Sequence, residues 1–231
     1  MKQLFIVFIV LLATSFVVAN NSKTEVKEPL LNLYSSDLEE VVISAEKLGN
    51  NPQHVQDYIA TYANLAISER RVKGIPASLK IAQGMLESDF GRSKAAINNN
   101  AHFCIKGTNL MSIKVYDKIE KSTSSYRGYE SVWWSYRDHS NLLLNDNYGW
   151  VFEDLTYGNY SDKLNQTNKW RKKSGFKSIS KIWKWKWNRL ESYEKVAYGI
   201  HVSGYATDSR YSNKISQIIK KYKLYELDKL T

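Results

Sequence analysis

The stretch GIPASLKIAQGMLESDFG at residues 74–91 constrains the fold of this chain more than any other part of the sequence. Its apolar residues recur at helical spacing and mark one buried face: Ile75, Leu79, Ala82 and Leu86. Pro76 suits the first helical position, where a missing N–H costs nothing. Gly91 ends the helix. The stretch therefore predicts an amphipathic helix that packs against a core.

The same helix presents one carboxylate, Glu87, from an otherwise apolar turn. We expect the neighbouring Met85, Leu86 and Phe90 to exclude part of the water around it. Desolvation raises the pKa of a carboxyl group and makes it a usable general acid. The alternative is a solvated surface glutamate, which is the common state of glutamates in helices.

Residues 1–19 have the pattern of a secretory signal peptide, with Lys2, an almost unbroken apolar run and small residues before a cleavage site ahead of Asn20. The apolar run is short for a membrane span, and an uncleaved anchor is the alternative. No cysteine stands directly after the cleavage site, where Asn20 lies, and this argues against a lipid anchor. We therefore expect an exported protein of the periplasm, the cell envelope or the medium.

Signal cleavage removes one lysine and no acidic residue, so the formal net charge of +10 falls by one. A basic exported chain is attracted to anionic polymers and surfaces. Export favours cell-wall polymers or anionic lipid over nucleic acid as the partner. The single cysteine, Cys104, excludes an intramolecular disulfide, and the few histidines show no metal-ligand spacing, so neither a metal nor another cofactor is expected.

The pattern beyond the signal predicts a polar linker or arm at residues 20–50 and one domain at 51–231, expected to be monomeric. Helices are predicted from Pro52 to Gly74, from Ser131 to about residue 144, and from the N-cap Asp208 onward. The core face of this last helix is expected to be Tyr211, Ile215, Ile218 or Ile219, and Tyr222. Residues 98–100 indicate a turn, and strand-like alternation at 112–116 with a partner at 122–129 predicts a small β-hairpin.

Five motifs then appear in order: IAQGMLES at 81–88, NNNAHFCIK at 98–106, YRGY at 126–129, RDH at 137–139 and GYATD at 204–208. In this order and over roughly residues 55–226, the chain resembles the glucosaminidase domain of glycoside hydrolase family 73. The resemblance implies an α+β, mainly α fold: a lysozyme-like helical domain with a small β-hairpin lobe. It also implies an endo-β-N-acetylglucosaminidase that cuts peptidoglycan strands between N-acetylglucosamine and N-acetylmuramic acid.

The resemblance assigns the role of general acid to Glu87. Glycosidic cleavage usually needs a second carboxylate, which the family carries on the hairpin, where this chain has Asp117 and Glu120. Asp117 is the better match, and a solvated hairpin acid is the alternative. Tyr205 would orient the acetamido group or the attacking water. The N-acetyl group of the substrate could also replace a protein nucleophile.

The same motifs supply candidate substrate-binding residues. They are Gln83, His102, Phe103, Glu120, Tyr129 and Asp208. We expect His102 and Phe103 to form the floor of the cleft, with a role in the core as the alternative.

Four positions depart from the family pattern. Cys104 stands where the family usually has glycine, and is interpreted as a small packed residue, with a reactive thiol as the alternative. Asp89 also replaces a usual glycine, and its charge is expected to raise the pKa of Glu87 further. A pair of tryptophans, 133–134, replaces residues that are often acidic.

Residues 165–189 resemble a basic, tryptophan-rich insertion. If the segment were a strand, Trp183, Trp185 and Trp187 would share one face and the intervening lysines the other. Such a face would stack on sugars and meet anions of the wall or of a lipid surface. The alternatives are a hairpin that packs its tryptophans on the core, and a helix that lies at a membrane interface.

Two other functions remain open on the sequence alone. One is a neighbouring activity, a muramidase or a lytic transglycosylase, of which the latter needs one acid and no second carboxylate. The other is a wall-binding module that has lost activity, which the departures would allow but the intact Glu87 opposes.

Overall fold

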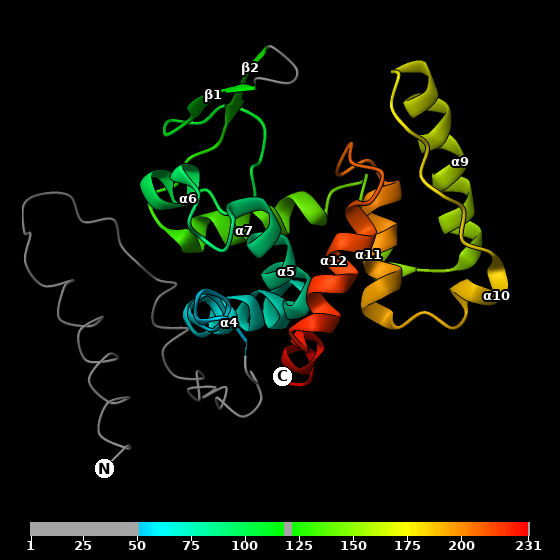
Figure 1. Ribbon diagram of the computed structural model, residues 1–231, viewed down its shortest axis with the longest axis horizontal. Helices are drawn as coiled ribbons and strands as arrows, with labels where there is room; N and C mark the ends of the chain where they lie inside the picture. Colours follow the sequence, from blue (N-terminus) through cyan, green and yellow to red (C-terminus); the bar gives the residue numbers. More distant parts are fainter. Residues whose placement is uncertain (1–50, 118–121, 231) are drawn as a thin grey trace, which may run out of the picture. The chain divides into compact units, whose positions relative to one another are not determined.

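Helix α5 (Ala77–Ser88) runs through the centre of the computed structural model, which describes residues 51–117 and 122–230 (Figure 1). All of its residues except Leu86 and Glu87 are buried, because α4, α11, α12 and the terminal 3-10 helix η1 pack around it. The predicted helix is confirmed, but it is a core helix rather than an amphipathic one. The side chain of Tyr58 passes so close to Gly84 that an added Cβ would lie 2.2 Å from the Tyr58 hydroxyl.

Helix α4 (Gln53–Lys73) precedes α5 and packs against it, as the sequence predicts for this pair. Its core face includes Val55, Tyr58 and Ile59. Gly74 ends α4 with φ of 72°, a conformation that favours glycine. Helix α7 (Val132–Leu143) lies across α4 and follows Ser131, the predicted N-cap position.

The predicted hairpin is confirmed as the one sheet of the described residues. Strands β1 (Ile113–Asp117) and β2 (Ser122–Tyr126) pair antiparallel, with Ile113 opposite Tyr126 and Asp117 opposite Ser122. The short helix α6 (Lys94–Asn99) precedes them and ends at Asn100, where the predicted turn occurs with φ of 51°. Glu120 lies in the connecting segment 118–121, outside the described residues.

Helices α11 (Ser192–Val202) and α12 (Tyr211–Lys221) pack on α5, and η1 (Leu224–Lys229) covers the N-terminal half of α5. The predicted core face of the last helix is confirmed: Tyr211, Ile215, Ile219 and Tyr222 are buried. Its N-cap is Arg210 rather than Asp208, because the Asp208 carboxylate accepts the Arg210 backbone N–H, at 2.9 Å, before the helix begins.

Of the alternatives for residues 183–187, the structure shows a helix rather than a strand. Residues 165–189 comprise the later part of α9 (Tyr157–Lys173), an irregular segment and the short helix α10 (Lys184–Trp187), and α8 (Trp150–Glu153) precedes α9. Trp187 is buried in a second apolar cluster, where it stacks on Tyr160 at 4.1 Å between ring centroids. Trp183 and Trp185 stay exposed. The three indoles therefore do not share one face.

Within the described ranges, no helix combines the length and the apolar character that crossing a bilayer requires.

Candidate active site

Glu87 is held at the C-terminal end of α5 by a tight turn. Asp89, Phe90 and Gly91 have φ of 51°, 56° and 76°, so the chain leaves the helix immediately after Ser88. The Phe90 N–H donates to the Met85 carbonyl at 2.9 Å, and the Gly91 N–H donates to the Ser88 hydroxyl at 2.7 Å. The turn explains why a glycine is usual at position 89, since Asp89 adopts a left-handed conformation there.

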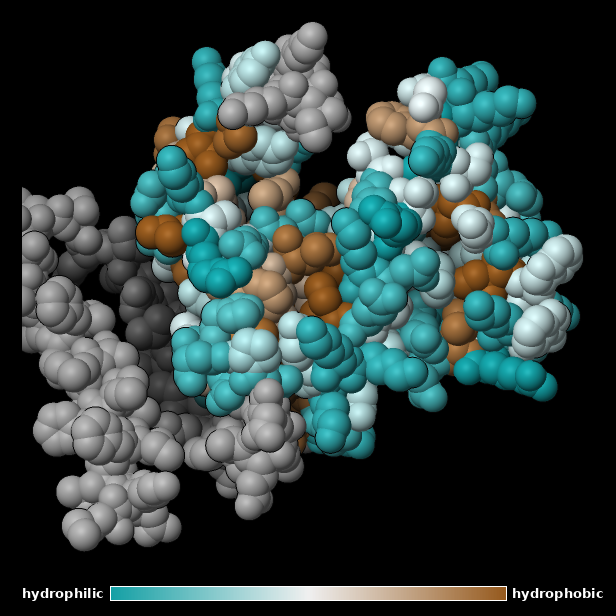
Figure 2. Space-filling view, viewed as in Figure 1, coloured by the Kyte–Doolittle hydropathy of each residue, from teal (hydrophilic) through white to brown (hydrophobic). Residues whose placement is uncertain are grey.

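The carboxyl group of Glu87 lies in a cleft of about 530 Å³. Five of the side chains that line it are aromatic: Phe103, Tyr126, Tyr148, Tyr205 and Tyr211. They come from the loop after α6, from β2, from the segment after α7, from residues 204–208 (here the rim loop) and from α12. Figure 2 shows a hollow between the part that carries the hairpin and the part that carries α9. Sugar rings stack favourably on such aromatic walls.

Burial raises the pKa of Glu87 to about 7. A hydrogen bond with Tyr211 and the positive charge of Lys214 oppose this shift without cancelling it. The expected contribution of Asp89 is absent, because its exposed carboxylate forms an ion pair with Arg92 at 2.9 Å. A carboxyl group with this pKa is partly protonated near neutral pH and can donate a proton.

A buried hydrogen-bond chain orients Glu87 from behind. Gln83, one turn earlier on α5, donates from Nε2 to the Tyr211 hydroxyl at 2.9 Å, and that hydroxyl bonds to the Glu87 carboxyl. Gln83 has no exposed surface and does not line the cleft. The predicted contact of Gln83 with substrate stays a prediction, and its observed partner is Tyr211. Tyr211, which the sequence pattern predicted only as a core residue, lines the cleft instead.

A second buried chain leads to Tyr205. The Lys80 ammonium lies 2.6 Å from the Tyr136 carbonyl, 2.9 Å from the Ser140 hydroxyl and 3.1 Å from His139 Nδ1. His139 Nε2 lies 3.1 Å from the Tyr205 hydroxyl. Burial lowers the pKa of Lys80 well below its usual range, while the negative charge of Glu69 opposes that shift.

The contacts of Lys80 favour its charged form, because the ammonium has three donors and meets three acceptors. Its Nζ also lies 4.8 Å from the Phe103 ring centroid and 5.1 Å from that of Tyr136. A charged Lys80 donates to His139 Nδ1, so Nε2 carries the hydrogen and donates to Tyr205. The hydroxyl hydrogen of Tyr205 then remains available to the cleft.

Cys104 also borders the acid. Its Sγ lies 3.3 Å from the Glu87 carbonyl oxygen, and its φ of 47° lies in the left-handed region that favours glycine. Burial and the charge of Glu87 raise the pKa of the thiol to about 11. A thiol with this pKa is protonated at neutral pH and is a poor nucleophile.

Two more predicted residues line the cleft. Phe103 stacks on His139 with ring centroids 3.9 Å apart. Asp208 forms an ion pair with Lys214 at 2.7 Å, and this pair lowers the pKa of the Asp208 carboxyl. Of the predicted substrate-binding residues, Phe103 and Asp208 therefore accompany Glu87 and Tyr205 in one cleft.

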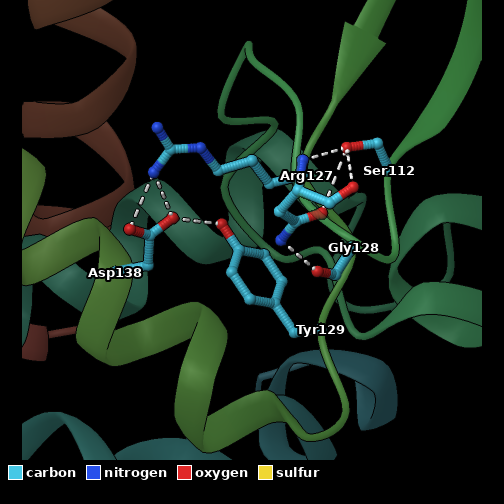
Figure 3. A network of polar contacts seen from close by, with 6 residues as sticks. Ser112, Arg127, Gly128, Tyr129 and Asp138 are labelled. Atoms are coloured by element: carbon cyan, nitrogen blue, oxygen red, sulfur yellow. Dashed lines mark hydrogen bonds and ion pairs between the residues drawn. The ribbon is translucent and has the colours of Figure 1, made fainter.

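His102 and Tyr129 do not line this cleft, and their predicted contact with substrate stays a prediction. The burial of His102 fits its alternative role in the core. His102 is buried, with Nδ1 3.1 Å from the Tyr58 hydroxyl. Tyr129 donates to Asp138 at 2.6 Å, and Arg127 binds the same carboxylate at 2.9 Å (Figure 3). Tyr129 borders a separate hollow of about 440 Å³. Both residues therefore belong to the framework around the cleft.

Asp117 is the last residue of β1, and its backbone pairs with Ser122. Its role as the second carboxylate, like that of Glu120, stays a prediction. Among the described residues, no group of three or more histidine, cysteine or acidic side chains is arranged to hold a metal ion.

A carboxylic acid at the end of a buried helix, in an aromatic cleft beside a small hairpin, defines the class of the protein: a lysozyme-like domain of the glycoside hydrolase type. A family model named Glucosaminidase and described as mannosyl-glycoprotein endo-β-N-acetylglucosaminidase matches residues 63–224. Because this match spans well over half of the chain, the chain belongs to the glucosaminidase family, glycoside hydrolase family 73.

Two curated relatives are similar to this chain. The exo-glucosaminidase LytG of Bacillus subtilis is 29% identical over 160 residues, which are 66% of this chain and 46% of that protein. An N-acetylmuramoyl-L-alanine amidase domain-containing protein of Staphylococcus aureus is 28% identical over 163 residues, 67% of this chain and 22% of that protein. The chain therefore spans less than half the length of either relative.

A solved structure supports the fold. The crystal structure of an N-acetylmuramoyl-L-alanine amidase from Staphylococcus aureus superposes with a TM-score of 0.54 and 24% identity, over 77% of this chain and 44% of that one.

Proposed function

We propose that this chain is an exported hydrolase that cleaves the β-1,4 bond between N-acetylglucosamine and N-acetylmuramic acid in peptidoglycan, with Glu87 as the general acid. The observation that carries the proposal is the position of Glu87 in an aromatic cleft, where burial raises its pKa to about 7. The signal-like pattern at residues 1–19 supports export.

In the proposed reaction, Glu87 donates its proton to the glycosidic oxygen as the bond from that oxygen to the anomeric carbon breaks. Water adds its oxygen to the anomeric carbon, and a base accepts the released proton. Asp117 is our candidate for that base, and attack by the N-acetyl group of the substrate is the alternative. The hydroxyl of Tyr205 would hold the acetamido group or the water.

The substrate proposal rests on charge and on the relatives. A net charge of +10 favours an acidic polymer such as peptidoglycan over a neutral mannosyl glycan. One relative is named an exo-glucosaminidase and the other carries the name of an N-acetylmuramoyl-L-alanine amidase domain. We propose internal cleavage, and release of single terminal sugars would instead assign the exo mode.

The test is digestion of purified peptidoglycan with the wild type and with Glu87→Gln, followed by mass spectrometry. Fragments with reducing N-acetylglucosamine ends, absent from the variant digest, are expected. Reducing muramic ends would assign a muramidase, and anhydromuramic ends a lytic transglycosylase. Wall binding without fragments from either protein would assign an inactive binding module. Cleavage of a high-mannose glycoprotein, with peptidoglycan intact, would overturn the choice of substrate.

A further inference from the structure

The insertion is fastened to the rim of the cleft by one buried side chain, Arg171, in the last turn of α9. Its guanidinium donates to the carbonyl oxygens of Ala206, at 3.2 Å, and of Thr207. Its Nε donates to the Lys177 carbonyl at 2.6 Å. Ala206 and Thr207 belong to the rim loop and line the cleft. The end of α9 and the segment after it therefore adjoin the rim loop, which lines the cleft.

Two exposed aromatic side chains lie at this border. Trp170 and Phe176 stack with ring centroids 5.7 Å apart and an interplanar angle of 29°. Their exposed fractions are 50% and 37%. The Phe176 ring lies 5.9 Å from the guanidinium carbon of Arg171, which fixes the pair near the rim loop. We call Trp170 and Phe176 the rim platform.

The sequence on both sides of the rim platform carries positive charge only. The neighbouring basic side chains Lys169, Lys172, Lys173 and Lys177 are exposed. The sequence has no acidic residue from Lys163 to Leu190. Aromatic faces combined with ammonium groups suit a ligand that alternates sugar rings with carboxylates.

We propose that the rim platform is a distal subsite for the glycan strand. It stacks on a sugar beyond those held in the cleft, while the surrounding lysines bind the lactyl and peptide carboxylates of the same strand. This inference rests on the proposed function, and it adds that the insertion makes the enzyme prefer long strands over short ones.

The same insertion contains a matched control pair. Trp183 and Trp185 are 63% and 62% exposed and also lie close to cations, Lys181 and Arg189. Trp183 is the N-cap of α10 and Trp185 belongs to it. Helix α10 contacts the first turn of α9 through Trp187 and Tyr157, whereas the rim platform lies at the last turn of α9 (Figure 1). Exchange of this pair removes two exposed aromatic rings, and more aromatic surface than the exchange of Trp170 and Phe176, at a distance from the rim loop.

The experiment compares Trp170→Ala/Phe176→Ala with Trp183→Ala/Trp185→Ala on long uncrosslinked glycan strands and on a short muropeptide-bearing tetrasaccharide. The readout is the ratio of kcat/KM for the long strand to that for the short one. We expect the first double variant to lower this ratio about tenfold, through KM, because one aromatic stacking contact is lost. The control variant is expected to keep the wild-type ratio.

An unchanged ratio in the first variant, or an equal fall in the control, would overturn the subsite. A second measurement is independent of catalysis: co-sedimentation of long strands with Glu87→Gln, alone and combined with each double exchange. If only the Trp170→Ala/Phe176→Ala exchange weakens binding to the strands, the subsite is supported. An inactive wild type would refute the proposed function but would leave this binding result standing. If the Trp170→Ala/Phe176→Ala exchange abolished binding to anionic phospholipid vesicles but left strand binding intact, the rim platform would be assigned to a membrane surface instead.

Discussion

At the scale of single residues, the state of Glu87 determines the pH range in which the chain can act. Because its pKa is about 7, the protonated acid is lost as the pH rises above neutrality. We therefore expect kcat/KM to fall along the alkaline limb of its pH profile. The charge of Lys214 lowers this pKa, so Lys214→Gln should move the limb to higher pH. Lys220→Gln on the same helix is the control. A limb at an unchanged pH in Lys214→Gln would refute the electrostatic assignment.

The raised pKa also predicts how stability depends on pH. The folded protein holds the Glu87 proton up to a pH of about 7, whereas the unfolded chain loses it near the ordinary value of 4.5. Stability from this group is thus complete at low pH and is lost as the pH rises through 7. Glu87→Gln should unfold with a free energy higher than wild type by about 1 to 3 kcal/mol at pH 8 and by much less at pH 4.5. Urea titrations at both pH values measure this, and an equal difference at both would contradict it.

Lys80 is expected to act through Tyr205. Lys80→Met removes the donor to His139 Nδ1, so the ring no longer has one fixed tautomer and the Tyr205 hydroxyl loses its orientation. We expect kcat to fall about tenfold with little change in KM. In a Tyr205→Phe background the same exchange should have no further effect, since coupled residues are not additive. If Lys80→Met lowered kcat equally in the wild-type and Tyr205→Phe backgrounds, or if it strongly lowered the midpoint of thermal unfolding, Lys80 would have only a structural role.

At the scale of helices and strands, periodicity predicted the elements whose partners are near in sequence. The α4–α5 pair and the hairpin follow from local patterns. The insertion does not follow from its local pattern, because residues 183–187 alternate like a strand, yet Trp187 packs on Tyr160 of another helix, α9. Glu87 and Tyr205 line one cleft, but which side of the mostly buried helix α5 faces that cleft is set by tertiary packing. The sequence therefore could not show that Gln83 faces Tyr211 and not the cleft.

Two helical glycines give a test of packing around α5. Ala at position 84 would put its Cβ 2.2 Å from the Tyr58 hydroxyl, so Gly84→Ala should lower the free energy of unfolding by about 1 to 3 kcal/mol. Gly158 in α9 has only an ordinary contact, at 3.8 Å, with Thr156, so Gly158→Ala should be neutral or raise stability by up to about 1 kcal/mol. Thermal and urea unfolding of both variants measure the difference. Equal effects would show that Tyr58 is free to move aside.

At the scale of the whole molecule, the question is whether wall binding follows net charge or its placement. Lys172 and Lys173 lie in the last turn of α9 near the rim platform, and Lys220 and Lys221 occupy the last turn of α12. Exchange of either pair for glutamine removes the same charge from equivalent helix positions. Binding of Glu87→Gln to purified walls should weaken from about 50 to about 300 mM salt, because screening shortens the range of charge attraction.

If placement decides, Lys172→Gln/Lys173→Gln should weaken wall binding at low salt and flatten its salt dependence more than Lys220→Gln/Lys221→Gln does. The physical reason is that charges beside a strand act at short range, whereas distant charges are screened within about 10 Å at 0.1 M salt. Sedimentation of the two variants with walls over the same salt series makes the comparison. Equal losses would mean that the basic insertion contributes only net charge, and the chain would then approach the wall without a preferred orientation.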